Sequence, residues 1–460
     1  MRRGERRKVE RDIWRAKWAT EDSIRARQER RLSDLLSFAR EHSRFYRDLY
    51  ADLPDELEAL PVVTKPMLMA NFDDVVTDPA VSWSGVSDFL AEGTNIGRRH
   101  LGRYPVWTTS GTTGEPGVFV QDDLSLILVG TVPDRWTTPA LLNPRMLARL
   151  IRNNLRGAEI AVTGGHFAGA SGFELIRRES RFLRERLRMF SPGQPIDDVV
   201  AGLNAFRPAF ITGYSTVLVE LGRAQRDGRL AITPAMIAAS GEPISVDAKR
   251  ALRDVFGCVV REMYGATEAV PLAVECHRGS LHLNADWFVL EPVDKTHSPV
   301  RPGQIGDTVL LTHLGNRIQP LIRYDLGDSV GLHTDRCSCG SAFPVLEIRG
   351  RQGEVLWFTD ADGRQVPLFP LALTTVVEGV PGVRRCQIIR IGPSTVEIRF
   401  DVLADADRET TWPLIRAALL RFFASQAIPG VAIEQGAQPP RRHQRSGKFR
   451  HVWTATTGLT

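Results

Sequence analysis

WTTSGTTGEPGVFVQ, residues 107–121, gathers threonine and serine hydroxyls around Gly111 and Gly114. Such a loop offers backbone N–H groups and hydroxyls that can wrap a polyphosphate. A Walker loop would end in Gly-Lys-Ser/Thr and open a helix. Here Glu115-Pro116-Gly117 and the β-type residues of GVFVQ follow Gly114. We therefore expect a loop between strands whose cation comes from elsewhere, with a ligand-free turn as the alternative.

Composition restricts the class of protein. The 460 residues have room for two or three domains, and 43% are apolar, as in globular proteins. No apolar run is long enough to span a membrane, and the basic, helical N-terminus has no apolar core like that of a secretory signal. We expect a cytoplasmic protein that binds neither membrane nor nucleic acid. The formal net charge is +5, yet lysines occur only at Lys8, Lys17, Lys65, Lys249, Lys295 and Lys448.

The pattern of apolar residues along the chain changes twice. Residues 1–60 have apolar residues at helical spacing. From about 105 to 350, short apolar runs such as MIAAS and CVVREMYG alternate with helical stretches, which is typical of an α/β domain. After 351, RRCQIIRIG and TVEIRFDVL predict paired strands, and TWPLIRAALLRFFAS predicts a helix. We place the boundary at IRGRQGEV, giving domains 1–350 and 351–460.

Four further segments follow the glycine loop in order: SGEP (240–243), YGATE (264–268), IRYDLGD (322–328) with RGR (349–351), and SGKF (446–449). Their order and spacing resemble the adenylate-forming superfamily, and most closely its phenylacetate–CoA ligase branch. The resemblance covers residue 35 onward. It implies an α/β fold, with a large multi-sheet N-terminal domain that binds ATP and the acid. A small, mobile α+β domain would carry Lys448 as a lid.

The resemblance implies a role for each matching residue. Adenylation joins two anions, a carboxylate and ATP, so positive charge and fixed geometry are needed. Thr267 would contact phosphate, and Glu268 would bind Mg²⁺. Asp328 would bind the ribose hydroxyls, and Arg351 would contact ribose and phosphate. Lys448 would bind the reacting carboxylate and the α-phosphate. The catalytic set is Lys448, Thr267 and Glu268. The remaining nucleotide-binding residues are Ser110, Gly111, Thr112, Thr113 and Gly114 for the phosphates, and Ser240, Gly241, Glu242, Pro243, Tyr264 and Gly265 for the adenine.

One position departs from the family pattern. Relatives carry an acidic residue or lysine two residues after the hinge arginine, where this chain has Gly353. Glycine can absorb a backbone rotation. Glycine also lacks the acidic side chain that could favour one orientation of the small domain. This departure from the family pattern leaves the thioester half-reaction undecided.

Cysteine and histidine spacing suggests a structural metal. Cys276 and His282 form Cys-x5-His, and Cys337 and Cys339 form Cys-x-Cys, which resembles a structural Zn²⁺ site. His277 competes with His282 as the fourth ligand, and ordinary buried thiols are the alternative. Five cysteines in all are too few and too uneven for a disulfide scaffold.

The acid pocket is the least determined part. By resemblance its walls would include Trp107, His166, Phe167, Tyr214, Ala239, Ala266 and Pro271, a set of aromatic and small residues that suits an aromatic acid. His166, in the glycine-rich TGGHFAG, could orient substrate or be a packed core residue.

These observations predict an acid–thiol ligase that makes an acyl-adenylate from ATP and passes the acyl group to coenzyme A. A carrier protein, an amine or a cofactor hydroxyl are alternative acceptors. A catalytically silent nucleotide-binding protein is the alternative of another class. The sequence is compatible with a homodimer but does not determine the oligomeric state.

Overall fold

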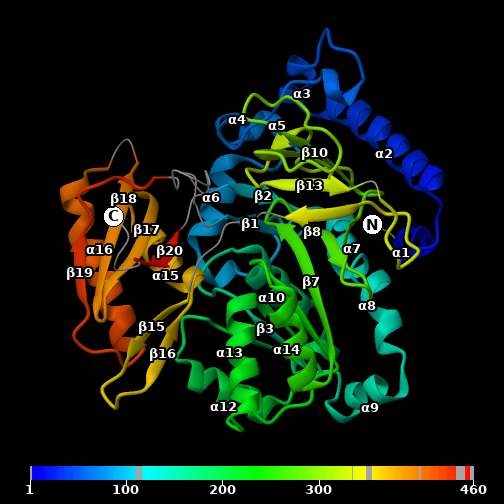
Figure 1. The fold of residues 1–460 in the computed structure, drawn as a ribbon. Coiled ribbons are helices and arrows are strands. Elements are labelled where there is room, and N and C mark those ends of the chain that lie inside the picture. The colour runs from blue at the N-terminus through cyan, green and yellow to red at the C-terminus, as the bar shows by residue number, and fades with distance from the viewer. Residues whose placement is uncertain are drawn as a thin grey trace.

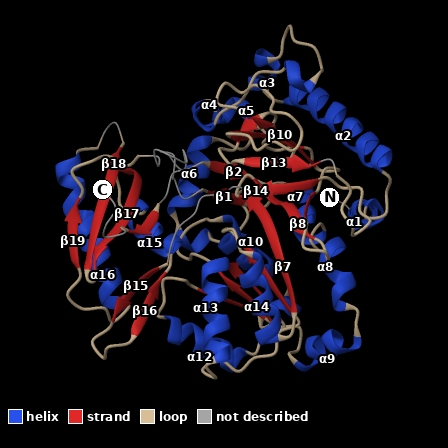
Figure 2. Cartoon of the chain, in the orientation of Figure 1, coloured by secondary structure: helices blue, strands red, loops and turns tan. Residues whose placement is uncertain are grey.

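The computed structural model describes residues 3–109, 117–333, 335–348, 355–403, 406–441 and 451–455, with the side chain of residue 371 excepted. An extensive α/β body is joined to a smaller C-terminal part, called here the C-terminal module (described residues 355–455) (Figure 1). Helices and strands alternate through the body, and β-strands dominate the C-terminal module (Figure 2). None of the helices within the described ranges is both long and apolar enough to cross a bilayer.

Helices form the first ninety residues. Thr20 and Ser43 begin α2 and α3, because their hydroxyls accept backbone N–H groups of Ser23 and Tyr46. The segments before the first strand are α1 (Arg3–Ala16), α2 (Glu21–His42), α3 (Arg44–Leu49), η1 (Leu57–Ala59), α4 (Lys65–Ala70), α5 (Phe72–Val75), α6 (Trp83–Ala91) and η2 (Gly93–Asn95).

The main sheet has the described order β13-β14-β9-β8-β7-β6-β5-β3-β4. The strands from β4 to β7 are parallel, and those from β7 to β13 are antiparallel. Helices cover the parallel strands, α13 and α14 among them (Figure 1). The central strands β5 (FITGY) and β6 (MIAAS) accordingly read as short runs without charged residues. The bounds of the strands in this sheet are β3 (Gly157–Ile160), β4 (Leu187–Phe190), β5 (Phe210–Tyr214), β6 (Met236–Ser240), β7 (Val259–Ala266), β8 (Ala269–Glu275), β9 (Leu281–Leu283), β13 (Val330–His333) and β14 (Val345–Ile348).

Two small sheets flank this frame. β1 (Val106–Thr108) pairs with β2 (Val118–Val120), so the glycine-rich loop lies between strands, as predicted. β10 (Phe288–Val293), β11 (Thr308–His313) and β12 (Tyr324–Asp325) form the other sheet. The helices of the body are α7 (Asp123–Thr131), α8 (Asp134–Leu141), α9 (Pro144–Arg152), α10 (Ala168–Glu179), α11 (Arg181–Arg184), α12 (Ile196–Phe206), α13 (Ser215–Arg226) and α14 (Val246–Phe256).

The C-terminal module contains a described four-stranded sheet in the order β19-β18-β17-β20. Both predicted strands and the predicted helix are present there as β17, β18 and α16. The elements are β15 (Leu356–Thr359), β16 (Gln365–Leu368), α15 (Pro370–Glu378), β17 (Val383–Gly392), β18 (Thr395–Val402), α16 (Arg408–Ser425), β19 (Ala432–Gln435) and β20 (Val452–Thr454).

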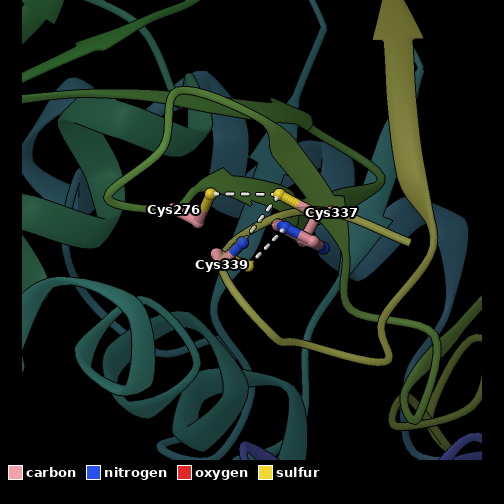
Figure 3. Close-up of side chains that lie close together, drawn as sticks. Cys276, Cys337 and Cys339 are labelled. Carbon is pink, nitrogen blue, oxygen red and sulfur yellow. Dashed lines mark hydrogen bonds between the residues drawn. The ribbon is translucent and has the colours of Figure 1, made fainter. Parts of the chain in front are cut away.

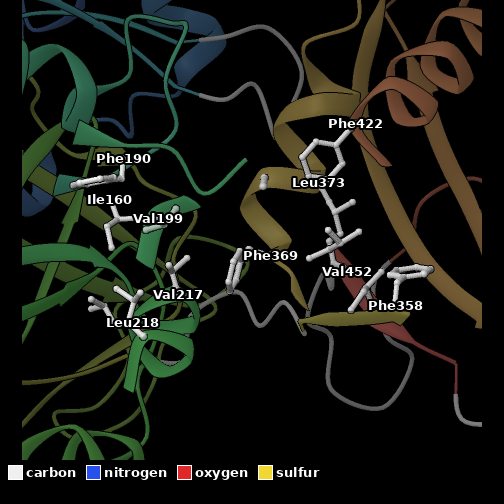
Figure 4. Packing of buried hydrophobic residues seen from close by; sticks show 14 of the residues in the cluster. Ile160, Phe190, Val199, Val217, Leu218, Phe358, Phe369, Leu373, Phe422 and Val452 are labelled. Carbon is white, nitrogen blue, oxygen red and sulfur yellow. The ribbon is translucent and has the colours of Figure 1, made fainter. Parts of the chain in front are cut away.

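One apolar cluster extends from the parallel strands into the module. Ile160 and Val217 belong to it on the body side, and Leu373 and Val452 on the module side (Figure 4). The amide of Gln426 donates to the Gly193 carbonyl across this junction at 2.5 Å. The division at residue 351 stays a prediction, and residues 349–354 lie outside the described ranges.

Candidate active site

A cavity of about 900 Å³ opens where several strands of the body end. Predicted site residues from segments far apart in the sequence line it together. They are Gly241, Glu242, Pro243, Tyr264, Gly265, Ala266, Thr267, Glu268 and Asp328. Thr109, the last described residue before the glycine loop, lines it too. Its backbone N–H donates to the Gly117 carbonyl at 3.0 Å, and its hydroxyl accepts from the Gly117 N–H at 2.8 Å. The two described ends of the loop are therefore joined at the cavity.

Glu268 is a buried carboxylate in this cavity, and the Tyr324 hydroxyl donates to it at 3.0 Å. Burial raises the pKa of Glu268, and the nearby Asp328 raises it further. A buried negative charge is costly unless a cation compensates for it. A buried carboxylate that lines an open cavity fits one protein ligand of Mg²⁺, whose remaining ligands are usually phosphate oxygens and water.

Tyr264 and Asp328 are 64 residues apart in sequence, and the Tyr264 hydroxyl donates to Asp328 Oδ2 at 2.8 Å. The predicted base-stacking ring and the predicted ribose carboxylate thus share one wall of the cavity. A carboxylate has two acceptor oxygens, which suits a vicinal diol.

The SGEP segment needs its glycine. Gly241 has φ +75°, and a Cβ there would lie 2.9 Å from the ring of Tyr214. A side chain would be strained and would collide, so the chain can turn against Tyr214 only with glycine. Glu242 is held by the Thr216 N–H at 3.0 Å and the Thr216 hydroxyl at 2.7 Å.

Several predicted residues lie outside the described part of the chain: Ser110, Gly111, Thr112, Thr113, Gly114, Arg351, Gly353 and Lys448. Their roles stay predictions.

Other predicted residues are described but are not among those that line the cavity: Trp107, His166, Phe167, Tyr214, Ala239, Ser240 and Pro271. Tyr214 still contacts its wall through Gly241. His166 is buried beside Phe89, with ring centroids 5.6 Å apart, and burial lowers its pKa. Within the described ranges, its Nε2 and the indole N–H of Trp107 have no hydrogen-bond partner. Both readings of His166 therefore stay open.

Sequence reasoning missed two lysines of the cavity, Lys65 and Lys249. Lys249 forms ion pairs with Glu262 at 3.0 Å and Glu275 at 3.2 Å. The scarcity of lysine was a signal for both, but no motif placed either in the site.

The four residues of the predicted metal site come together on one side of the cavity wall. Cys276, His282, Cys337 and Cys339 each offer a ligand atom, and these atoms lie within 4.8 Å of one another (Figure 3). Cys276 Sγ and Cys337 Sγ are 3.9 Å apart, and Cys339 Sγ and His282 Nε2 are 3.3 Å apart. Tetrahedral Zn²⁺ would space two sulfurs by about 3.8 Å, and sulfur and nitrogen by about 3.5 Å. The residues therefore fit the ion.

Surrounding groups orient these ligands. His282 Nδ1 lies 2.8 Å from the Phe343 carbonyl, which leaves Nε2 facing Cys339. Trp136 stacks on the same ring at 4.9 Å. His277 is exposed, and the described cluster contains His282 instead.

Comparison with known proteins adds to this geometry. No family model matches the sequence. The phenylacetate–coenzyme A ligase of Thermus thermophilus is 25% identical over 372 residues, 79% of this chain and 77% of the relative. Protein CapK of Staphylococcus aureus is 29% identical over 145 residues, 31% of each chain.

Solved structures share the architecture. A 2-hydroxyisobutyryl-CoA ligase in the thioesterification state, in complex with 2-HIB-AMP and CoA, has a TM-score of 0.57 at 20% identity. The match covers 96% of this chain and 91% of that chain. In the postadenylation state, with R3-HIB-AMP, the score is 0.56.

The chain has the adenylate-forming fold and resembles phenylacetate–CoA ligases. Both the resemblance and the predicted fold class are thereby confirmed. The adenylate-forming fold explains why the cavity collects residues from distant segments, since strand ends of an α/β sheet meet at one edge.

Proposed function

We propose that this chain is an AMP-forming acid–thiol ligase that uses ATP and Mg²⁺. It converts a carboxylic acid into an acyl-adenylate and passes the acyl group to coenzyme A. The observation that carries the proposal is the single cavity lined by Gly241–Pro243, Tyr264–Glu268 and Asp328. The names of its relatives, CoA ligases among them, support the same activity.

In the first half-reaction a carboxylate oxygen attacks the α-phosphorus, and the bond from that phosphorus to the pyrophosphate oxygen breaks. Tyr264 and Asp328 would hold the nucleoside, and Thr267 would position the α-phosphate. Mg²⁺ bound at Glu268 would neutralise phosphate oxygens. Lys448 is assigned to the reacting oxygens by resemblance alone. In the second half-reaction the thiol attacks the acyl carbon, and AMP leaves.

The names of two relatives indicate two different classes of carboxylic acid substrate. Phenylacetate is aromatic, whereas 2-hydroxyisobutyrate is small and carries a hydroxyl. We favour an aromatic acid, because the phenylacetate–coenzyme A ligase is the more similar of the two in sequence, at 25% identity against 20%.

The test is pyrophosphate release from ATP and Mg²⁺ with aryl, alkyl and 2-hydroxy acids, each with and without coenzyme A. We expect release that depends on one aryl acid and rises with coenzyme A, together with a thioester product. Release independent of coenzyme A would instead point to a carrier protein or amine as acceptor. ATP binding without release for any acid would favour the catalytically silent alternative.

We also propose a structural Zn²⁺ at Cys276, His282, Cys337 and Cys339. Four protein ligands leave no open position, so the ion would stabilise the fold and take no part in the reaction. Elemental analysis of the purified protein should find about one equivalent. His282→Asn should abolish it, and the matched His277→Asn should not. A stable wild-type protein without zinc would overturn the assignment.

A further inference from the structure

A second cavity, of about 740 Å³, lies at the edge of the main sheet. It is bordered by α10, α11 and β4, and none of the described residues lines both this space and the active-site cavity. β4 is the last strand in the described order of the sheet, so no other described strand pairs with its outer edge. The space is called here the arginine cavity, after the residues that dominate its lining.

Positive charge exceeds negative charge in this lining. The charged residues are Arg177, Arg178, Arg184 and Arg188, with Glu174 and Glu185. Glu174 pairs with Arg177 at 2.7 Å and with Arg178 at 3.1 Å, which compensates part of the charge. In the part of the chain that the structure describes, no carboxylate lies within ion-pair distance of Arg184 or Arg188. These two guanidinium groups are therefore free to meet an anionic ligand.

The rest of the lining is largely apolar. The guanidinium carbon of Arg188 lies 4.7 Å from the centre of the Phe206 ring, and Phe173 and Met189 border the same space. Guanidinium groups bind phosphate oxygens bidentately, and aromatic side chains suit the flat face of a base. The lining thus fits a ligand that combines phosphate groups with a ring.

The open edge of β4 adds backbone donors. The carbonyls of Arg186 and Phe190 accept N–H groups of β3 and its next residue at 2.7 and 3.1 Å. Successive residues of a strand direct their backbone groups to opposite sides, so the N–H groups of Leu187 and Met189 point away from β3. Both residues line the arginine cavity, and their N–H groups can donate to an anion there.

One end of the arginine cavity approaches the active site. Thr163 and Gly164 line this end. Two residues further on, the His166 carbonyl accepts the Thr108 N–H at 2.8 Å, and the next residue, Thr109, lines the active-site cavity. Two Cα steps, this hydrogen-bonded contact and one further step place Gly164 within about 17 Å of Thr109. A ligand with a long flexible arm can therefore have its anionic end in one cavity and its reactive end in the other.

We propose that the arginine cavity binds the phosphate-bearing end of coenzyme A, with Arg184 and Arg188 as phosphate contacts. The thiol arm passes Gly164 and reaches the acyl-adenylate in the active-site cavity. This inference rests on the proposed acid–thiol ligase activity, and it selects coenzyme A among the acceptors that the sequence left open. A simple amine has no phosphate groups for these arginines to bind.

The test compares wild type with the double variant Arg184→Gln, Arg188→Gln. The matched control is Arg181→Gln, because Arg181 is exposed on α11 and does not line the arginine cavity. Two probes divide coenzyme A into its parts: 3′,5′-ADP carries its phosphates and base, and pantetheine carries its thiol arm without them. The dissociation constant for 3′,5′-ADP is measured by calorimetry with AMP saturating, so that the active site is occupied. Thioester formation gives the KM for coenzyme A and for pantetheine, and melting curves report whether each variant is folded.

The double variant should raise the KM for coenzyme A and the dissociation constant for 3′,5′-ADP by about ten- to one-hundredfold, because charge-assisted hydrogen bonds are lost. The KM for ATP, the KM for pantetheine and the dissociation constant for AMP should each change less than about threefold. Arg181→Gln should match the wild type with every ligand.

Equal losses for coenzyme A and pantetheine, equal losses in Arg181→Gln, or an unchanged KM for coenzyme A in the double variant would overturn the proposal. A wild-type protein that does not bind 3′,5′-ADP would also overturn it, while acid-dependent pyrophosphate release would leave the proposed adenylation standing. A wild-type protein that binds 3′,5′-ADP through these arginines but forms no thioester would refute the proposed transfer and support the assignment of the cavity.

Discussion

The cavity of the proposed active site and the cysteine cluster share one wall but differ in construction. Gly279, Ser280 and Leu281 line the cavity, while Cys276 and His282 on either side of them belong to the cluster. In the cavity, the carboxylates of Glu268 and Asp328 each accept a tyrosine hydroxyl and border about 900 Å³ of space.

In the cluster, the four ligand atoms already face one another within 4.8 Å. Backbone N–H groups of Arg278, Cys339 and Ser341 approach the three sulfurs at 3.4 Å each. A site for turnover must admit and release its ligand, whereas a structural site gains from being closed. A single wall can therefore border both an open site for turnover and a closed structural site. Substitutions in one of the two sites should leave the other unchanged.

The largest effect is expected at Glu268. Glu268→Gln removes the proposed Mg²⁺ ligand, and acid-dependent pyrophosphate release should fall by about one-hundred- to one-thousandfold. Zinc content should stay unchanged, which would show that the two sites are independent. Glu347→Gln, on another wall of the same cavity, is the control and should change release less than about threefold. Near-normal turnover in Glu268→Gln would contradict the assignment.

Disrupting the cysteine cluster should lower the stability of the fold more than it changes the affinity for AMP. Cys339→Ser should lose zinc and lower the free energy of unfolding by about 2–4 kcal/mol, because a structural metal contributes directly to folding. AMP affinity at a temperature where the variant is folded should change little. Cys258→Ser replaces a buried cysteine outside the cluster and should keep its zinc. Equal zinc loss in both variants would mean that the cluster is not the site.

A smaller effect is expected from the contact between Tyr264 and Asp328. Tyr264→Phe keeps the ring and removes the hydroxyl that donates to Asp328. Loss of one such hydrogen bond should weaken AMP binding by about three- to tenfold, measured by calorimetry. Tyr104→Phe, which removes a hydroxyl that donates to Asp78 outside the cavity lining, should leave AMP affinity unchanged. An unaltered AMP affinity in Tyr264→Phe would exclude a positioning role for this hydroxyl.

The last prediction concerns pH and tests the sheet that supports both sites. Burial raises the pKa of Glu159 on β3 to about 7, from an ordinary value of 4.5. Between these values the unfolded chain loses its proton while the folded protein keeps it, so stability falls as pH rises through this window. Glu159→Gln removes this dependence, and its melting temperature relative to wild type should rise from pH 5 to pH 8. The exposed Glu185→Gln should show a difference independent of pH, and a flat difference for Glu159→Gln would contradict the prediction.

Local pattern was enough to predict many elements of the fold. MIAAS coincides with β6 (Met236–Ser240), because a buried parallel strand is a short apolar run. Gly241 in SGEP was predicted only as part of the adenine-binding segment, and its φ of +75° against Tyr214 shows why the turn there needs glycine. The cysteine spacing predicted a cluster, since short-range spacing limits where each pair can lie.

Long-range pairing could not be predicted from local pattern. Lys65 reaches the cavity only because Val63 bridges to Tyr324, some 260 residues later, and no local pattern encodes that backbone pairing. The choice between His277 and His282 was also undecided in sequence; His282 lies on β9 beneath Trp136, while His277 is exposed.

The sequence by itself determined the order of motifs, the alternation of strands and helices, and the residue types able to hold phosphate, ribose and metal. The tertiary structure alone decided which of them meet: Glu268 with Tyr324, Tyr264 with Asp328, and Lys65 with the end of the glycine-rich loop. The physical reason is that periodicity and turn chemistry act over a few residues, whereas a binding cavity depends on which distant strands pair and where their ends coincide.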